Sequence, residues 1–234
     1  HKITILASIA FGIPINFDAV HVEGISNLSQ KDITYAEELG YKIKLLGIAK
    51  SQNADVEIRV HPTLVPKNRL VANVDGAMNA VLVHGNMVGP TLYYGAGAGA
   101  EPTASAVVAD VIDIARQTKL SQNTLIPSLG FMPDKINEKN ILSIENIISE
   151  YYLRFTMKNQ AGLLAKITNI FADHDISINS MVHKEVQENN QNPDIFLITS
   201  KTKEADIDTI ISEIELLPEN TEKVVKIRTE ELNK

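Results

Sequence analysis

The 234-residue sequence predicts an α+β protein built from two parts, and two patterns carry this prediction. In the first part, four short segments rich in β-branched or aromatic residues are separated by turn-forming residues, which is typical of a largely antiparallel sheet. From Ser149 onward, strand-like and helix-like periods follow the order β-α-β-β-α-β. That order predicts an antiparallel sheet with two helices on one face.

The first part should contain three helices. Residues 1 to about 11 are dense in Ile, Leu and Ala, and Gly12 follows, so a helix is expected to end there. Ser29, with Asp32 three residues later, has the form of a capping box and predicts a short helix that stops at Gly40. Pro102 suits the first turn of a third helix that extends to about residue 117.

The strands of the first part lie between the second and third helices. We expect them at residues 41–50, 56–61, 78–84 and 91–94. Residues 118–148 contain loop-like runs and two prolines without a clean period, and they are interpreted as a connection. The predicted domains are therefore 1–117, the linker 118–148, and 149–234.

The second part shows sharper periods. Residues 151–157 alternate apolar and polar side chains, as in a half-buried strand, and 163–171 and 207–214 have helical spacing. Further strands are expected at 176–182, 194–200 and 223–228, with a turn at 188–193. The two helices should cover one face of the resulting sheet.

Composition excludes several classes of function. The net charge is −7 and no block of basic residues occurs, so nucleic acid is not an expected partner. Cysteine is absent, which removes disulfides and thiolate zinc sites and is typical of a reducing compartment such as the cytoplasm. The longest apolar run, 3–11, is too short to span a bilayer, so we expect no membrane segment. The histidines form no metal motif, and no metal is expected.

The run "YYGAGAGAEPTASAVVAD" contains glycines at 95, 97 and 99, directly before the third helix. Gly95, Gly97 and Ala100 satisfy a loose G-x-G-x-x-A pattern, but a dinucleotide fold needs a parallel strand after the helix, and polar loop follows instead. Two interpretations stay open. The glycines allow tight packing against the small face of the helix, or their N–H groups face an anion or a flat ring.

Four runs in order resemble the catalytic region of bacterial homoserine dehydrogenase: "HKITILASIAFG", "VEGISNLSQKDITYAEELGYKIKLLGIAK", "VHPTLVPKNRLVANVDGAMNAV" and "YYGAGAGAEPTASAVVADVIDIAR". The resemblance implies NAD(P)-dependent interconversion of L-homoserine and L-aspartate 4-semialdehyde, in threonine, methionine and isoleucine biosynthesis. In that family a Rossmann domain precedes this region, so we expect a fragment that is inactive alone. The resemblance also implies that Gly95, Gly97 and Gly99 lie beside the nicotinamide, although many members have proline where this chain has Ala96.

Lys2 is the catalytic candidate. A lone lysine near a helix start is most often a solvated surface group. The run "HKITIL", however, resembles the D-x-x-x-K-[LIV]-x-I-L helix of the family, which implies that Lys2 is the catalytic lysine. A lysine amine can move a proton to or from the substrate oxygen during hydride transfer. The family's acidic partner, four residues earlier, falls before His1.

The run "MKNQAGLLAKI", at 157–167, lies between a predicted strand and helix, where free N–H groups suit a carboxylate. Its D/N-x-x-G-L-L pattern in this topology resembles the ACT domain, a ferredoxin-like sensor of amino acids. The resemblance implies threonine as the effector and the following ligand-binding residues: Asn159, Gln160, Ala161, Gly162 and Leu163, with Ile178 and Asn179 of the next strand opposite.

Two functions are weighed on these patterns. One is a threonine-regulated homoserine dehydrogenase, and the alternative is a non-catalytic, amino-acid-binding regulatory and dimerisation fragment. A homodimer or homotetramer is expected in either case, because open sheet edges invite pairing between copies.

Overall fold

The computed structural model describes residues 1–52, 55–119, 127, 129–184 and 192–232 and confirms the predicted α+β class. Most of the predicted turn at 188–193 therefore lies outside the described residues. A seven-stranded sheet joins the two parts of the described chain, in the order β1–β3–β11–β7–β9–β8, with β2 on the remaining edge of β3. Its strands are β1 (His21–Val22), β2 (Tyr41–Gln52), β3 (Asp55–Pro66), β7 (Tyr151–Thr156), β8 (Ile178–Lys184), β9 (Asp194–Thr199) and β11 (Val225–Thr229).

β3 is the strand at which the two parts meet. β2 pairs antiparallel with β3 along its whole length, as expected for the predicted antiparallel sheet. On the other edge, β1 pairs in parallel at Arg59 and Val60, and β11 pairs in parallel at Thr63 and Leu64. The sheet of the second part thus continues directly into that of the first.

The predicted helices of the first part are present. They are α1 (Lys2–Phe11), α2 (Gln30–Glu38) and α3 (Ala100–Gln117). Gly12 ends α1 with a left-handed φ of 63°, which glycine adopts at little cost. The predicted capping box at the start of α2 is formed, since the Ser29 hydroxyl accepts from the Asp32 N–H and the Asp32 carboxylate accepts from the Ser29 N–H.

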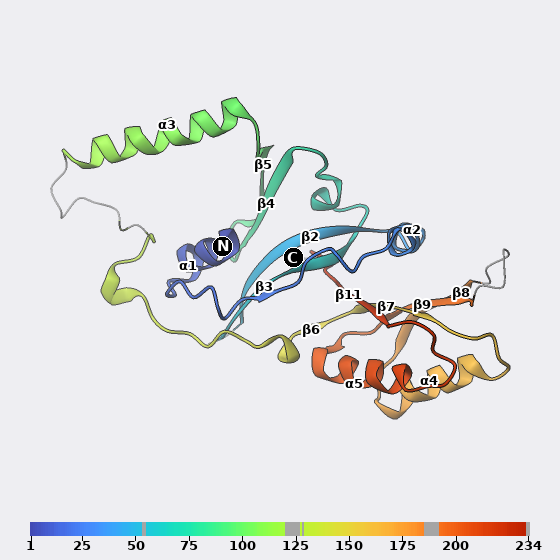
Figure 1. The fold of residues 1–234 in the computed structure, drawn as a ribbon. Helices are drawn as coiled ribbons and strands as arrows, with labels where there is room; N and C mark the ends of the chain where they lie inside the picture. Colours follow the sequence, from blue (N-terminus) through green and yellow to red (C-terminus); the bar gives the residue numbers. More distant parts are fainter. Residues whose placement is uncertain (53–54, 120–126, 128, 185–191, 233–234) are drawn as a thin grey trace.

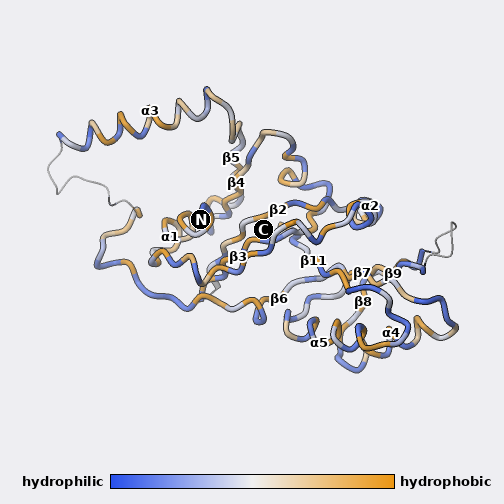
Figure 2. Tube along the Cα trace, viewed as in Figure 1, coloured by the Kyte–Doolittle hydropathy of each residue, from blue (hydrophilic) through white to orange (hydrophobic). Residues whose placement is uncertain are grey.

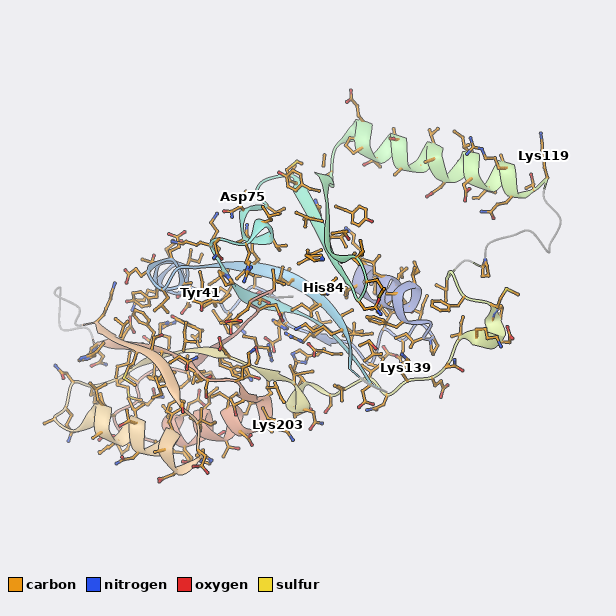
Figure 3. The ribbon with its side chains drawn as sticks, turned by 180° about the vertical axis from the view of Figure 1, so that it is seen from behind. Tyr41, Asp75, His84, Lys119, Lys139 and Lys203 are labelled. Carbon is orange, nitrogen blue, oxygen red and sulfur yellow. The ribbon has the colours of Figure 1, made fainter. Side chains whose placement is uncertain are left out.

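α3 and the hairpin of β4 (Met78–Gly85) and β5 (Gly89–Ala96) project from the rest of the molecule (Figure 1). β4 and β5 pair only with each other among the described strands. α3 has no buried residue over its 18 positions. Apolar and polar segments alternate along it (Figure 2), and the helix extends away from the body of the protein toward Lys119 (Figure 3).

The second part has the predicted β-α-β-β-α-β order. Helices α4 (Leu163–Asp173) and α5 (Glu204–Glu215) pack on one face of β11–β7–β9–β8, also as predicted. Fully buried side chains fill the layer between them, among them Leu153, Phe155 and Ile210. This layer is the largest apolar core of the described chain, and its period-two and helical patterns explain why the sequence predicted it well.

The opposite face of that sheet is covered by α2 of the first part, which the sequence did not predict. Tyr35 and Ala36 of α2 pack with Tyr152, Phe196 and Ile227 of the sheet. The rings of Tyr35 and Phe196 are stacked, with centroids 4.4 Å apart and planes 11° from parallel. The strands are consequently buried on both faces, and the two parts share a core.

The predicted linker also packs against the first part where it is described. The Val56 N–H donates to the Asn140 carbonyl, and the Leu142 N–H donates to the Val56 carbonyl, each at 2.9 Å. The remaining short elements are η1 (Leu70–Asn73), η3 (Pro133–Lys135), η4 (Ile144–Asn146) and the paired strands β6 (Ile148–Ser149) and β10 (Thr202–Lys203). No helix in the described part of the chain is long and apolar enough to cross a membrane.

Candidate functional site

Lys2 is the first residue of α1, and its side chain is exposed. The start of this helix packs closely on β2. Ile3 lies directly over Gly47, where an added Cβ would be 3.1 Å from the Cβ of Ile3. Deeper in α1, Ala7 packs in a core with Val56 and Ile58 of β3. The helix therefore has a fixed position on the first part of the sheet, and it presents Lys2 at the surface.

The three predicted cofactor-binding glycines lie at the end of β5 and the start of α3. A Cβ at Gly97 would lie 1.8 Å from Nδ2 of Asn79, so no larger residue fits without rearrangement, and the Gly97 N–H donates to the Ala77 carbonyl at 3.1 Å. Gly99 is the N-cap of α3, with φ of 126°. A Cβ at Gly95 would meet open space.

Two of the three glycines therefore have a local structural reason. The tight contact is made with Asn79 of β4, whereas the sequence-based interpretation placed it on the small face of the following helix. That part of the interpretation is wrong, because the helix leaves the hairpin instead of folding back onto it (Figure 1).

A pocket of about 200 Å³ lies at the start of α4. It contains four of the five residues predicted from the loop after β7: Asn159, Gln160, Gly162 and Leu163. Gly162 is the N-cap of α4, with a left-handed φ of 85° and no side chain to cap the helix. The N–H groups of the first helical turn can therefore face a carboxylate.

The strand β8 contributes His183 to this pocket, not the predicted Ile178 and Asn179. β7 and β8 both pair antiparallel with β9, so they run in the same direction. The loop that follows β7 therefore lies near the last residues of β8. Ile178 and Asn179 are at the other end of the strand, where the Asn179 side chain donates to the Thr199 carbonyl at 3.1 Å.

A second pocket lies beside the end of α1, lined by Ile13, Pro14, Asn16, Ala19 and the segment 138–141. Neither of these two pockets contains Lys2 or the three glycines. No group of three or more His, Asp or Glu side chains within the described ranges is arranged to hold a metal ion.

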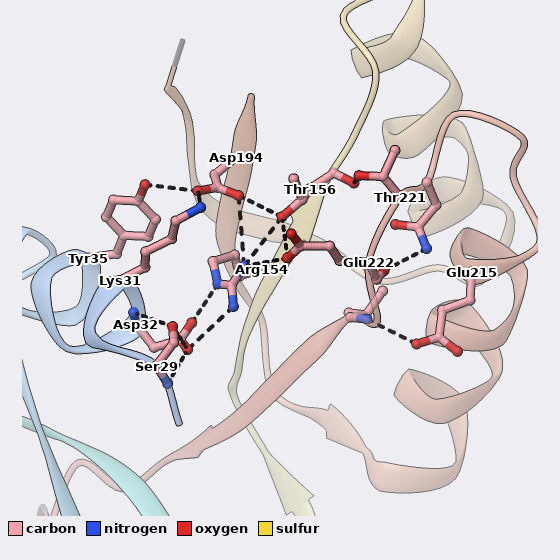
Figure 4. A network of polar contacts seen from close by, with 12 residues as sticks. Ser29, Lys31, Asp32, Tyr35, Arg154, Thr156, Asp194, Glu215, Thr221 and Glu222 are labelled. Atoms are coloured by element: carbon pink, nitrogen blue, oxygen red, sulfur yellow. Dashed lines mark hydrogen bonds and ion pairs between the residues drawn. The ribbon is translucent and has the colours of Figure 1, made fainter. Parts of the chain in front are cut away.

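A buried polar network fastens α2 to the sheet of the second part (Figure 4). The guanidinium of Arg154, on β7, donates to Asp32 through Nε at 2.6 Å. Asp194, on β9, accepts from the Lys31 ammonium at 3.1 Å, the Tyr35 hydroxyl at 3.0 Å and the Thr156 hydroxyl at 2.7 Å. Asp32 and Asp194 are both fully buried.

These contacts shift the pKa values of Asp194 and Tyr35. Burial by itself would raise the pKa of Asp194, but hydrogen bonds from Thr156, Lys31 and Tyr35 outweigh it and lower the pKa. Burial and the neighbouring Asp194 charge raise the pKa of Tyr35 to about 12. Asp194 is therefore ionised and Tyr35 is a neutral donor at neutral pH.

Comparison with known proteins assigns both parts. Residues 1–112 match the family model described as homoserine dehydrogenase, and residues 151–219 match the model described as ACT domain. The chain belongs to the homoserine dehydrogenase family. The βαββαβ part of the sheet is its ACT domain.

Similar proteins support this assignment along the whole chain. Homoserine dehydrogenases from Pseudomonas aeruginosa and Neisseria gonorrhoeae are each 48% identical over 233 residues, covering all of this chain and 54% and 53% of theirs. A crystal structure of a homoserine dehydrogenase from Thiobacillus denitrificans superposes with a TM-score of 0.91 at 52% identity, covering all of this chain and 52% of that one. The chain thus spans about half the length of the curated relatives that it matches.

Sequence reasoning missed the buried charges at the junction of the two parts of this family member. Arg228, on β11, donates to Glu23 at 2.8 Å and also to Glu204 of α5, and it is fully buried. Burial would raise the pKa of Glu23, but the hydrogen bond and charge of Arg228 lower it to about 2. These three residues come from distant parts of the sequence, so no local pattern marks them.

His61, one of the histidines that form no metal motif in the sequence, is fully buried. Its Nε2 accepts from the Arg59 guanidinium, and its Nδ1–H therefore faces the Pro62 carbonyl at 2.9 Å. Burial, followed by the Arg59 and Arg228 charges, lowers the pKa of His61 to about 3. A period-two row of polar residues at Glu57, Arg59 and His61 within a predicted strand was the available signal.

Proposed function

We propose that this chain serves in the NAD(P)-dependent interconversion of L-homoserine and L-aspartate 4-semialdehyde, the step that the family resemblance implies for threonine, methionine and isoleucine biosynthesis. The observation that carries the proposal is the 48% identity to curated homoserine dehydrogenases along the entire chain. We further propose the domain division 1–117, 118–148 and 149–234, and a cytoplasmic location.

In this proposal, NAD(P) would supply the hydride chemistry at the carbonyl carbon of the substrate. Lys2 then holds or moves the proton at the adjacent oxygen, for which an exposed amine at a fixed helix start is suited. Such a proton transfer contributes roughly 10²- to 10⁴-fold to a rate.

The glycine segment fits the nicotinamide only in part. Open space at Gly95 and the first turn of α3 after Gly99 leave a bare backbone edge. The Gly97 N–H is already bonded within the hairpin, so its role there would be to keep the edge flat. The main nucleotide site would lie in the Rossmann domain that precedes this region in the family.

The exposed apolar face of α3 supports a further covering segment. The face includes Val107, Val108, Val111, Ile112 and Ile114, all at least 45% exposed. Packing of an apolar face supplies most of the stability of helices in proteins, and α3 lacks that packing in the described chain. We propose that the nucleotide-binding part covers it in the full-length protein.

We propose that the pocket at Asn159–Ala165 binds an amino acid, with threonine as the effector. The first-turn N–H groups of α4 suit the carboxylate, and the side chains of Asn159 and Gln160 can meet the polar groups. The same pocket is what favours the second candidate function, a regulatory fragment without turnover of its own.

A homodimer or homotetramer remains part of the proposal. The two-stranded β4–β5 sheet exposes Val81, Val83 and Tyr93, and a lone hairpin is marginally stable in water. β8 forms an edge of the larger sheet among the described strands and offers a second place for pairing between copies.

Oxidation of NADPH with L-aspartate 4-semialdehyde tests the catalytic proposal. The full-length protein that contains this chain should turn over, and the 234-residue chain alone should not. Lys2→Ala in the full-length protein should lower kcat by about 10²- to 10⁴-fold, while Lys135→Ala, at another exposed lysine, should leave it unchanged. Full activity of Lys2→Ala, or turnover by the 234-residue chain, would contradict the proposal.

Calorimetric titration with L-threonine tests the regulatory pocket in the 234-residue chain. Binding heat is expected, and Gly162→Val should abolish it, because the added side chain would strain the left-handed N-cap and fill the pocket. If the heat equals that of a blank titration, the proposal that threonine is the effector is wrong.

A further inference from the structure

Helix α2 lies on the opposite face of the ACT sheet from α4, whose first turn lines the Asn159–Ala165 pocket. Its bonds to Asp194 and Lys184 lie at the end of the sheet where the pocket is found. We propose that α2 is the coupling element through which an amino acid in that pocket acts on α1, the helix that carries Lys2. This inference rests on the proposed regulatory pocket, and its experiment separates the two.

Strand β7 connects the pocket to α2. Its last residue, Thr156, is three positions before Asn159, which lines the pocket. The Thr156 hydroxyl donates to Asp194, and Asp194 in turn accepts from Lys31 and Tyr35 of α2. A ligand that repositions the loop after β7 therefore acts on a residue that is bonded to the α2 network.

Strand β8 makes a second connection at the same end of the sheet. His183 lines the pocket, and the next residue, Lys184, is on the α2 face. The Lys184 ammonium bonds to the carboxylate of Glu38 and lies 5.0 Å from the ring centroid of Tyr35. Adjacent residues of one strand thus contact the pocket and the helix.

α2 is held along its whole length, so it must follow the sheet. Asp32 near its start is bonded to Arg154, and Glu38 at its end is bonded to Lys184. Between them, Tyr35 stacks on Phe196 of β9. Close packing of this kind transmits displacement because it leaves no free volume to absorb it.

The end of α2 leads into the catalytic part without a flexible connection. Leu39 and Gly40 alone separate it from β2, and the Gly40 carbonyl accepts from the Lys67 N–H at 2.9 Å. In the middle of β2, Gly47 lies directly against Ile3, next to Lys2. A movement of α2 therefore reaches α1 through one strand.

Hydrogen exchange in the 234-residue chain tests this route. Saturating L-threonine should slow exchange at least 3-fold in peptides covering residues 30–38 and 2–11, in line with couplings of roughly 5- to 150-fold between linked sites. The double variant Lys31→Met/Glu38→Gln removes two partly exposed contacts of α2 and should reduce the response of residues 2–11 below 2-fold.

Glu37→Gln is the control for the Glu38→Gln half of the double variant, because it makes the same carboxylate-to-amide change on the same helix at an exposed neighbouring position. It should keep the full response, and the double variant should still give binding heat with L-threonine. Heat of binding without any change at residues 30–38 and 2–11 would overturn the coupling inference alone. An absence of heat in the unmodified chain would instead overturn the pocket, and the inference with it.

Discussion

The ACT sheet and the β4–β5–α3 arm are built from equally regular elements but differ in what covers them. Leu153, Phe155 and Ile210 of the ACT domain are fully buried, and α2 closes the second face of its sheet. α3 has no buried residue, and β4 and β5 pair only with each other in the described chain. Regular secondary structure therefore indicates little about stability, which comes from the apolar surface that each element removes from water.

The largest expected difference between the two regions concerns arginine. Arg154→Met leaves the buried Asp32 without its counterion and should lower the free energy of unfolding by about 3–5 kcal/mol. Arg116→Met, in the last turn of the exposed α3, should change it by less than about 0.5 kcal/mol. Urea denaturation followed by circular dichroism measures both, and an Arg154→Met variant as stable as the unmodified chain would contradict the role of the network.

Truncation of isoleucine should give the next largest difference. Ile210→Ala removes a fully buried side chain from the ACT core and should cost about 2–5 kcal/mol. Ile112→Ala makes the same change in α3, where the side chain is 45% exposed, and should be nearly neutral in this chain. If Ile112→Ala were equally destabilising in urea denaturation, α3 would be covered already, for example by a second copy.

The buried His61 should make the free energy of unfolding depend on pH. Since the pKa of His61 is lowered to about 3, the unfolded chain takes up a proton below pH 6.5 that the folded chain does not. Below pH 6.5 each unit of pH lowers the free energy of unfolding by about 1.4 kcal/mol, because only the unfolded chain binds this proton. The free energy of unfolding should therefore fall by about 2 kcal/mol between pH 7.5 and 5. Glu23, whose pKa is lowered to about 2, loses its contribution only below pH 4.5, outside this window.

His61→Gln should flatten that pH dependence, and His84→Gln, on the exposed hairpin, should not change it. Chemical denaturation of the three proteins at pH 7.5, 6.5, 5.5 and 5 compares the slopes independently of each variant's absolute stability. An unchanged slope in His61→Gln would show that another group titrates.

The last expected effect is confined to the β4–β5–α3 arm. Gly97→Ala places a Cβ 1.8 Å from Asn79 and should destabilise the end of the hairpin by about 1–3 kcal/mol. Hydrogen exchange of residues 89–96 should rise while global unfolding stays the same. Gly97→Ala/Asn79→Ala should restore slow exchange, and continued fast exchange in the double variant would contradict the steric role of Asn79.

The sequence predicted those residues of the candidate site that lie close together along the chain. The loop after β7 yielded four residues of the pocket, because Gly162 and the helix start belong to one short run. His183 was missed, since choosing the correct end of β8 requires knowing that β7 and β8 both pair with β9. Lys2 and the glycines at 95, 97 and 99 stay predictions from the resemblance.

Residue spacing was enough to predict the last turn of α1 before Gly12, the start of α2 at Ser29, the antiparallel strands of the first part and the βαββαβ order of the ACT domain. Residue spacing encodes these features, because helical and strand periods and caps act over a few neighbouring residues. The packing of α2 on the ACT sheet and the bond between Asp32 and Arg154, 122 positions away, are visible in the folded chain alone. Such contacts depend on the relative placement of whole elements, which no local period records.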